Sequence, residues 1–262
     1  MESDFFTYSR QSIAHEREFG NCDVAHNRAA ALCSLSKFLG KETLSFSELS
    51  PQMMQEFKAW FMTNGRKETT ARLYLCQINA LYKEAAKAGI ATQQQLLKGI
   101  NLSMPAKQKR ELLSEDELRR MRYADLSQSK PQAFARDIFF FSIYCRGISF
   151  TDLAHIKKSD INGFTLTYTS QMANPSHITV PWDAAMQEIA NRYPSDTDYL
   201  FPFIKSSNKV MKSREIGRVR ENITRALRQI AHRCGLSVTP SLNMVTGLYQ
   251  RAINNVRVSQ II

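Results

Sequence analysis

The sequence predicts a mainly α protein with a small β-hairpin or sheet, which is an α+β fold. Two observations predict it: apolar residues recur at helical spacing along most of the 262 residues, and one pair of β-prone runs interrupts them. With 43% hydrophobic residues, the chain can build one large core or two smaller ones. This composition excludes collagen-like, low-complexity and disordered proteins.

The first hundred residues are expected to be helical. One helix should span residues 21–39 and end at Gly40, and a second should open at Ser50-Pro51, where an N-cap residue precedes proline. A third should run from about Thr69 to Ala88. Its apolar face is predicted to consist of Ala71, Leu75, Ile78, Leu81, Tyr82 and Ala85.

Basic residues gather at the start of this third helix. The N-terminal end of a helix suits an anion such as phosphate. Arg66, Lys67 and Arg72 are therefore candidate phosphate contacts, although an ordinary solvated first turn explains them equally well.

Residues 101–110 have no apolar period and carry a basic cluster that includes Lys107 and Lys109. Such a segment is typical of a linker. The sequence therefore predicts a helical domain over residues 1–104, a linker over 105–110 and a second domain over 111–262. Lys107 and Lys109 are further candidate phosphate contacts.

The second domain is expected to alternate helices with a single hairpin. Ser114 and Glu117 have the spacing of a capping box, in which each end of the first turn satisfies the other. The expected elements are a helix from Ser114, a core helix over 134–144, a hairpin of 164–169 and 177–180, a short helix opened by Ser149, and helices over 182–192 and 213–234.

The positive charge is concentrated in the last fifth of the chain. The net charge is +11, which favours an acidic partner such as nucleic acid or anionic lipid. In the helix expected over 213–234, the apolar residues cluster on one side, and four arginines lie within about 40° of the opposite pole. These are Arg214, Arg218, Arg225 and Arg228. A duplex phosphate backbone would neutralise such a row, whereas a merely solvated face is the alternative.

Five scattered cysteines with no C-x-x-C pair indicate a reduced, cytoplasmic protein without a zinc site. The most apolar stretch, residues 138–144, is too short to span a bilayer, and no signal-peptide pattern opens the chain. No metal, small-molecule cofactor or membrane partner is expected.

The segment Tyr144-Cys-Arg-Gly-Ile-Ser-Phe-Thr-Asp-Leu153, followed by Ser159-Asp-Ile161, strongly resembles the first arginine box of the tyrosine site-specific recombinases, the phage and transposon integrases, especially those of the Bacteroides type. The resemblance covers nearly the whole chain. It implies a SAM-like core-binding domain over residues 1–104 and a catalytic domain over 111–262. It also implies double-stranded DNA as partner, further recombinase protomers, and a role in the integration or recombination of a mobile element.

The resemblance implies a metal-free phosphoryl transfer, in which a tyrosine attacks a DNA phosphodiester and two arginines stabilise the transition state. A hairpin lysine protonates the leaving oxygen. Arg146 matches the first arginine, and Arg66, Lys67, Arg72, Lys107, Lys109 and the four helix arginines become candidate DNA contacts. A helix-ending arginine paired with a carboxylate is the other interpretation of Arg146.

The sequence departs from the family pattern at the hairpin and the second box. Met172 occupies the lysine position and cannot donate a proton, while neighbouring His177 is a weak substitute. Two registers are open for the second box. One places Thr246 and Gly247 in the arginine and histidine positions; the other places Met244 and Val245 there.

The family's nucleophile is expected beyond Ile262, and Tyr249 lies too early to serve. The sequence thus predicts a C-terminally truncated, catalytically inactive DNA-binding protein of the integrase type. The alternatives are an active recombinase subunit completed in trans, or a helical DNA-binding regulator unrelated to recombinases.

Overall fold

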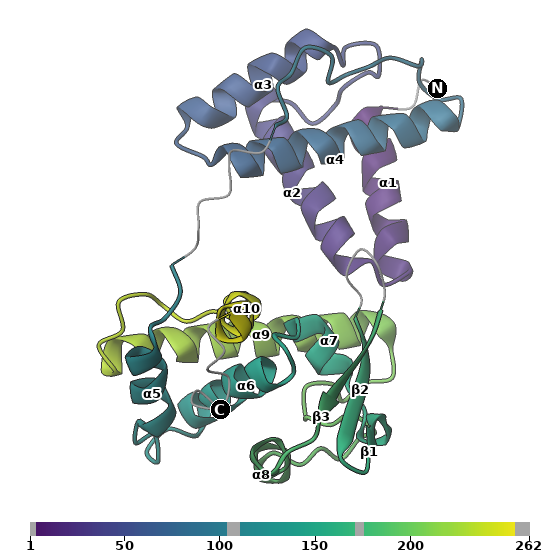
Figure 1. Cartoon of the computed structure of the whole chain (residues 1–262). Helices are drawn as coiled ribbons and strands as arrows, with labels where there is room; N and C mark the ends of the chain where they lie inside the picture. Colours follow the sequence, from purple (N-terminus) through teal and green to yellow (C-terminus); the bar gives the residue numbers. More distant parts are fainter. Residues whose placement is uncertain (1–3, 104–110, 171–175, 255–262) are drawn as a thin grey trace. The chain divides into compact units, whose positions relative to one another are not determined.

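The computed structural model describes residues 4–103, 111–170 and 176–254. The chain divides into two compact units, Met1–Gln108 and Lys109–Ile262. The linker expected over 105–110 lies outside the described residues. The mainly α fold with a small antiparallel sheet is confirmed (Figure 1).

The described part of the first unit is helical. Its helices are α1 (Phe5–Glu18), α2 (Cys22–Leu39), α3 (Pro51–Thr63) and α4 (Glu68–Lys87). Helix α1 precedes the first helix that the sequence predicts; the Asp4 side chain caps it by accepting from the Thr7 N–H at 2.9 Å. Only Phe5, Phe6, Ser9 and Ile13 are buried in it.

Helix α4 lies at the centre of the first unit and packs against α1, α2 and α3. All six residues predicted for its apolar face are buried. The Ser50 hydroxyl accepts from the Met53 N–H at 3.2 Å and Pro51 begins α3, so the predicted start of that helix is confirmed. These helices close one apolar core around α4.

The second unit combines six α-helices, a 3-10 turn and three strands within its described residues. In chain order they are α5 (Glu115–Tyr123), α6 (Lys130–Tyr144), α7 (Phe150–His155), η1 (Lys158–Asp160), β1 (Ile161–Asn162), β2 (Thr165–Ser170), β3 (Ser176–Pro181), α8 (Ala184–Arg192), α9 (Lys209–Arg233) and α10 (Val245–Asn254). The capping box at Ser114 and Glu117 is present.

The sheet is antiparallel in the order β1-β2-β3. Strand β2 pairs with β3 from Thr165 opposite Pro181 to Ser170 opposite Ser176, so the predicted hairpin is confirmed. Along β2, Leu166, Tyr168 and Ser170 are buried and alternate with exposed residues. This alternation directs the Tyr168 side chain into the unit.

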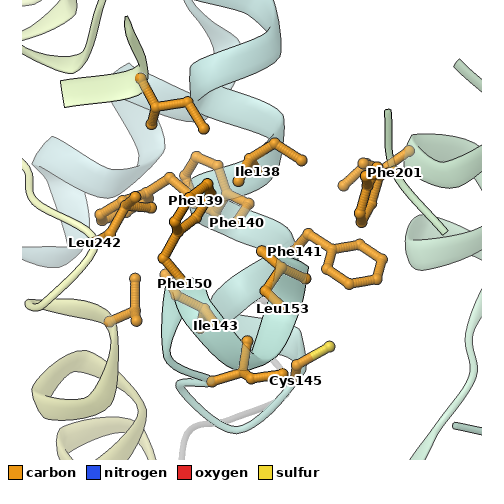
Figure 2. Packing of buried hydrophobic residues seen from close by; sticks show 14 of the residues in the cluster. Ile138, Phe139, Phe140, Phe141, Ile143, Cys145, Phe150, Leu153, Phe201 and Leu242 are labelled. Carbon is orange, nitrogen blue, oxygen red and sulfur yellow. The ribbon is translucent and has the colours of Figure 1, made fainter. Parts of the chain in front are cut away.

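Helix α6 is the core of the second unit and packs against α5, α8, α9 and α10. Residues 138–143 are all buried, as expected of a helix covered on every side. Figure 2 shows Phe201 and Leu242 on opposite sides of this helix, with Phe150 and Leu153 of α7 near its C-terminal end. The helix therefore ends at Tyr144 inside a packed environment, which fixes the turn that follows.

No helix in the described ranges is long and apolar enough to cross a membrane.

Candidate nucleic-acid interface

Helix α9 carries the row of arginines predicted from the sequence. Its Ile216, Ile223, Leu227 and Ile230 are at most 6% exposed, so this face is fixed against the core. The opposite pole carries the exposed side chains of Arg214, Arg218, Arg225 and Arg228, called here the arginine row. None of the hydrogen bonds and ion pairs in the described part of the chain involves these four guanidinium groups.

A fifth arginine of α9 is used differently. The Arg220 Nη2 donates to the Thr151 hydroxyl at 2.8 Å, and its guanidinium lies 5.6 Å from the centre of the Phe150 ring. These contacts join α9 to α7, the short helix that follows the Arg146 turn. The sequence places Arg220 in the same basic helix, and only the tertiary contacts separate it from the row.

The turn after α6 has an unusual backbone. Arg146 has a φ of 58°, in the left-handed region that L side chains rarely adopt, and Gly147 follows with a φ of 75°. The N–H groups of Gly147 and Ile148 both donate to the Ser142 carbonyl, at 2.9 and 3.2 Å. The Arg146 side chain is exposed, and no carboxylate of the described residues pairs with it.

Two hydroxyl groups hold the carbonyl groups of the residues before and after Arg146. The Tyr168 hydroxyl of β2 donates to the Cys145 carbonyl at 2.8 Å. The Thr246 hydroxyl of α10 donates to the Gly147 carbonyl at 2.9 Å. Burial raises the pKa of Tyr168 well above its usual value, so this phenol stays protonated and can donate throughout the neutral range.

Helix α10 reaches the Arg146 turn at close range. A Cβ on Gly147 would lie 2.6 Å from the Thr246 Cα, so only glycine fits at this position. Met244 and Val245 are buried, whereas Thr246 is exposed beside the turn. Of the residues in the two registers for the second box, Thr246 places its exposed side chain beside the Arg146 turn, and the backbone of Val245 lies next to it.

The first unit has a basic groove of 650 Å³ where α2 and α3 end and α4 begins. Its lining residues are Ser34, Lys37, Trp60, Phe61, Asn64, Gly65, Arg66, Lys67, Thr70 and Tyr74. The side chains of Lys37, Arg66 and Lys67 are exposed, and within the described ranges they form no ion pair. The basic pattern before α4 indicates Arg66 and Lys67 but not Lys37, which lies near the C-terminal end of α2.

Arg72 lies outside this groove lining. Its side chain is half-buried, and its Nε donates to the Leu102 carbonyl at 2.6 Å. Lys58 donates to the neighbouring Asn101 carbonyl at 3.0 Å. Arg72 therefore holds the segment that follows the helices of the first unit, a role for which the sequence gives no signal.

The remaining candidates are scattered. His177 is exposed on β3, with its Nδ1 3.2 Å from the Thr169 hydroxyl, and Tyr249 is half-buried on α10. Lys107, Lys109 and Met172 lie outside the described residues. In the part of the chain that the structure describes, no three His, Cys, Asp or Glu side chains gather closely enough to hold a metal ion.

Comparison with known proteins bears on this arrangement. Residues 4–99 match the family model of the phage integrase SAM-like domain. No curated protein matches the sequence. Among solved structures, a lambda integrase dimer bound to a COC′ core site has a TM-score of 0.65 at 16% identity, covering 99% of this chain and 93% of that chain.

Two other solved structures have the same fold. The recombinase XerH bound to a palindromic difH substrate matches with a TM-score of 0.62 and 15% identity over 89% of this chain and 69% of that one. The Tn1549 transposon integrase in complex with transposon right-end DNA gives 0.59 and 10% over 97% and 87%. The first unit of this protein thus matches the phage integrase SAM-like domain over residues 4–99, and the chain shares its fold with the lambda and Tn1549 integrases and with XerH.

Proposed function

We propose that this protein binds duplex DNA through both units without cleaving it, as an integrase-type protein of a mobile element. The arginine row carries the proposal. Four exposed guanidinium groups without partners among the described residues lie along one face of a helix whose other face is fixed in the core. Such a row matches the regular negative charge of a phosphate backbone.

The basic groove supplies a second set of cations in the first unit. Lys37, Arg66 and Lys67 border a concave surface that also has hydroxyl and amide groups, which suits a phosphate and its sugar. Two separate sets of phosphate contacts on two units would bind more tightly than either alone. Structures of the same fold in complex with DNA, including lambda integrase and the Tn1549 transposon integrase, support this partner and the mobile-element origin.

The residues around Arg146 support binding rather than cleavage. Stabilising the transition state of phosphoryl transfer requires several positive groups directed at the same phosphate. Thr246, which lies beside the Arg146 turn, is neutral, and its hydroxyl already donates to the Gly147 carbonyl. Met172 in the hairpin cannot protonate a leaving oxygen. In the described part of the chain, the turn thus presents Arg146 to a phosphate with the neutral Thr246 beside it, which favours binding over cleavage.

Protomers of this chain would share one DNA site. Lambda integrase of the same fold forms a dimer on a core site and a tetramer on a Holliday junction. Two or more copies side by side would place several arginine rows along one duplex.

A salt titration tests DNA binding. We expect the logarithm of the affinity for duplex DNA to fall linearly with the logarithm of the salt concentration, and the slope to drop by about 2 in the Arg218→Ala/Arg225→Ala variant. Lys83→Ala/Lys87→Ala removes the same charge from exposed positions on α4 and should leave the slope unchanged. If both variants behave alike, only net charge matters and the arginine row is not the interface.

A nicked suicide substrate tests the absence of cleavage. Such a substrate traps a covalent protein–DNA adduct as soon as a tyrosine attacks the phosphate. We expect DNA binding without any adduct on a denaturing gel. An adduct formed by this chain would show that it cleaves DNA.

A further inference from the structure

The backbone of Arg146 is held in a conformation that it would not adopt by itself. Its φ of 58° places the Cβ close to the following carbonyl, which is unfavourable for every residue with a side chain. A residue keeps such a conformation only when its surroundings fix it.

The peptide group before Arg146 and the peptide group after Gly147 are each fixed by a hydroxyl from a distant part of the chain. Tyr168 holds the Cys145 carbonyl at 2.8 Å, and Thr246 holds the Gly147 carbonyl at 2.9 Å. The peptide group between Arg146 and Gly147 is held as well, because the Gly147 N–H donates to the Ser142 carbonyl at 2.9 Å. A change of the Arg146 dihedral angles would therefore disturb at least one of these three hydrogen bonds. Strand β2 and helix α10 thus determine together the direction in which the Arg146 side chain leaves the backbone.

We propose that Tyr168 and Thr246 are positioning residues, whose hydroxyl groups hold the exposed Arg146 guanidinium in the orientation in which it binds a phosphate of the DNA backbone. This inference rests on the proposed function, because it assumes that DNA is the ligand of Arg146. A guanidinium fixed in its binding orientation loses less conformational freedom on binding, and its affinity for phosphate is correspondingly higher.

Thr246 has a distinct part in this arrangement. Its side chain is exposed, yet its hydroxyl donates to the backbone rather than reaching out to a ligand. The contact depends on Gly147, since any larger residue there would push α10 away. Thr246, which one of the two registers places at the second arginine of the resemblance, thus contacts the backbone next to the first arginine.

The test removes the hydroxyl while keeping the shape. Thr246→Val is nearly isosteric and cannot donate to the Gly147 carbonyl, whereas Thr246→Ser keeps a hydroxyl donor. Tyr168→Phe removes the hydroxyl that donates to the Cys145 carbonyl. Duplex affinity at low salt is measured for each in the full chain. We expect Arg146→Ala to weaken binding about tenfold, as the loss of one charge-assisted contact. Thr246→Val and Tyr168→Phe should each weaken it at least about threefold, and Thr246→Ser less than about twofold.

A double-mutant cycle separates positioning from general stability. If Thr246 acts through Arg146, adding Thr246→Val to Arg146→Ala should weaken binding no further. An unchanged affinity of Thr246→Val, or an equal loss in the presence and absence of Arg146, would overturn the proposal. So would a normal affinity of Arg146→Ala. In each of these cases the salt slope of Arg218→Ala/Arg225→Ala still tests the proposed function independently, whereas a wild-type chain that ignores DNA would refute both.

Discussion

Glu117 and Ser237 are joined by a hydrogen bond of 2.6 Å from the Ser237 N–H to the Glu117 Oε1, which ties the first turn of α5 to the segment between α9 and α10. The other carboxylate oxygen accepts from the Ser114 N–H at 2.8 Å. Donation by the Ser237 N–H, followed by that of Ser114, lowers the pKa of Glu117 to about 2. The Glu117 side chain therefore links the start of α5 to the segment that follows α9.

The lowered pKa of Glu117 predicts a loss of stability in acid. A carboxyl group whose pKa is lower in the folded state stabilises the fold above its unfolded pKa of 4.5, and the contribution disappears as the pH falls towards 2. Glu117→Gln should lower the stability of the second unit at pH 7 and flatten its pH dependence between these values. Both quantities are measured by urea unfolding at a series of pH values, followed by the fluorescence of Trp182 in a Trp60→Phe background.

Glu111→Gln is the matched control, because Glu111 is exposed and makes no hydrogen bond within the described ranges. It should leave both the stability and its pH dependence unchanged. A pH profile of Glu117→Gln that parallels the wild type would contradict the assignment.

Gly147 and Gly163 offer a comparison of close packing at similar backbone angles. Their φ values are 75° and 57°, so alanine is strained at both. A Cβ on Gly147 meets the Thr246 backbone at 2.6 Å, whereas a Cβ on Gly163 meets nothing within 4 Å. We expect Gly147→Ala to destabilise the second unit by about 1–3 kcal/mol more than Gly163→Ala. Equal losses in urea unfolding would mean that α10 does not pack on the turn.

Arg28 is expected to matter more to the first unit than any surface arginine. Its side chain is 7% exposed and pairs with Glu84 at 2.5 Å and with Glu16 at 3.3 Å. Arg28→Ala removes both ion pairs and the hydrogen bond to the Ser12 hydroxyl from a buried side chain, and it should cost about 2–3 kcal/mol in unfolding followed at Trp60. Arg10→Ala breaks an exposed pair with Glu42 and should cost less than about 1 kcal/mol. Comparable losses would refute the distinction.

The basic groove and the arginine row should contribute to DNA binding independently. Lys37→Ala/Arg66→Ala should lower the salt slope by about 2, and combining it with Arg218→Ala/Arg225→Ala should lower it by about 4. The measurement is the salt titration of the four combinations. A combined variant no worse than one of its parents would mean that the two surfaces do not contact DNA at the same time.

Periodicity predicts the long helices well, because the same apolar face is repeated over many helical turns. The buried residues of α4 were all predicted, and the arginine row was placed opposite Ile223 and Leu227, where the structure has it. Helix α1 was missed because its few buried positions include Ser9, a polar residue that breaks the apolar pattern. The integrase-type fold followed from the arginine box, which is local in the sequence.

Contacts between distant residues could not be predicted. Thr246 and Gly147 are 99 positions apart. The resemblance implies that the two boxes meet, but it leaves the register open and gives no sign that a hydroxyl of one box bonds to a carbonyl of the other. Similarly, the basic start of α4 predicted a phosphate contact for Arg72, but the chain returns there and the Leu102 carbonyl accepts from its guanidinium. The sequence shows the positions of the basic residues. The tertiary fold decides which of them bond to other parts of the protein and which remain available for a ligand.

The burial of α6 on every side also affects how the protein is made. Phe139, Phe140 and Phe141 leave the ribosome roughly a hundred residues before Leu242, which covers one side of the helix in the finished unit (Figure 2). At ordinary rates of translation this apolar segment waits for several seconds without its final neighbours. We expect chaperones that bind exposed aromatic segments to recognise the nascent chain in that interval, because these rings are buried once the second unit is complete.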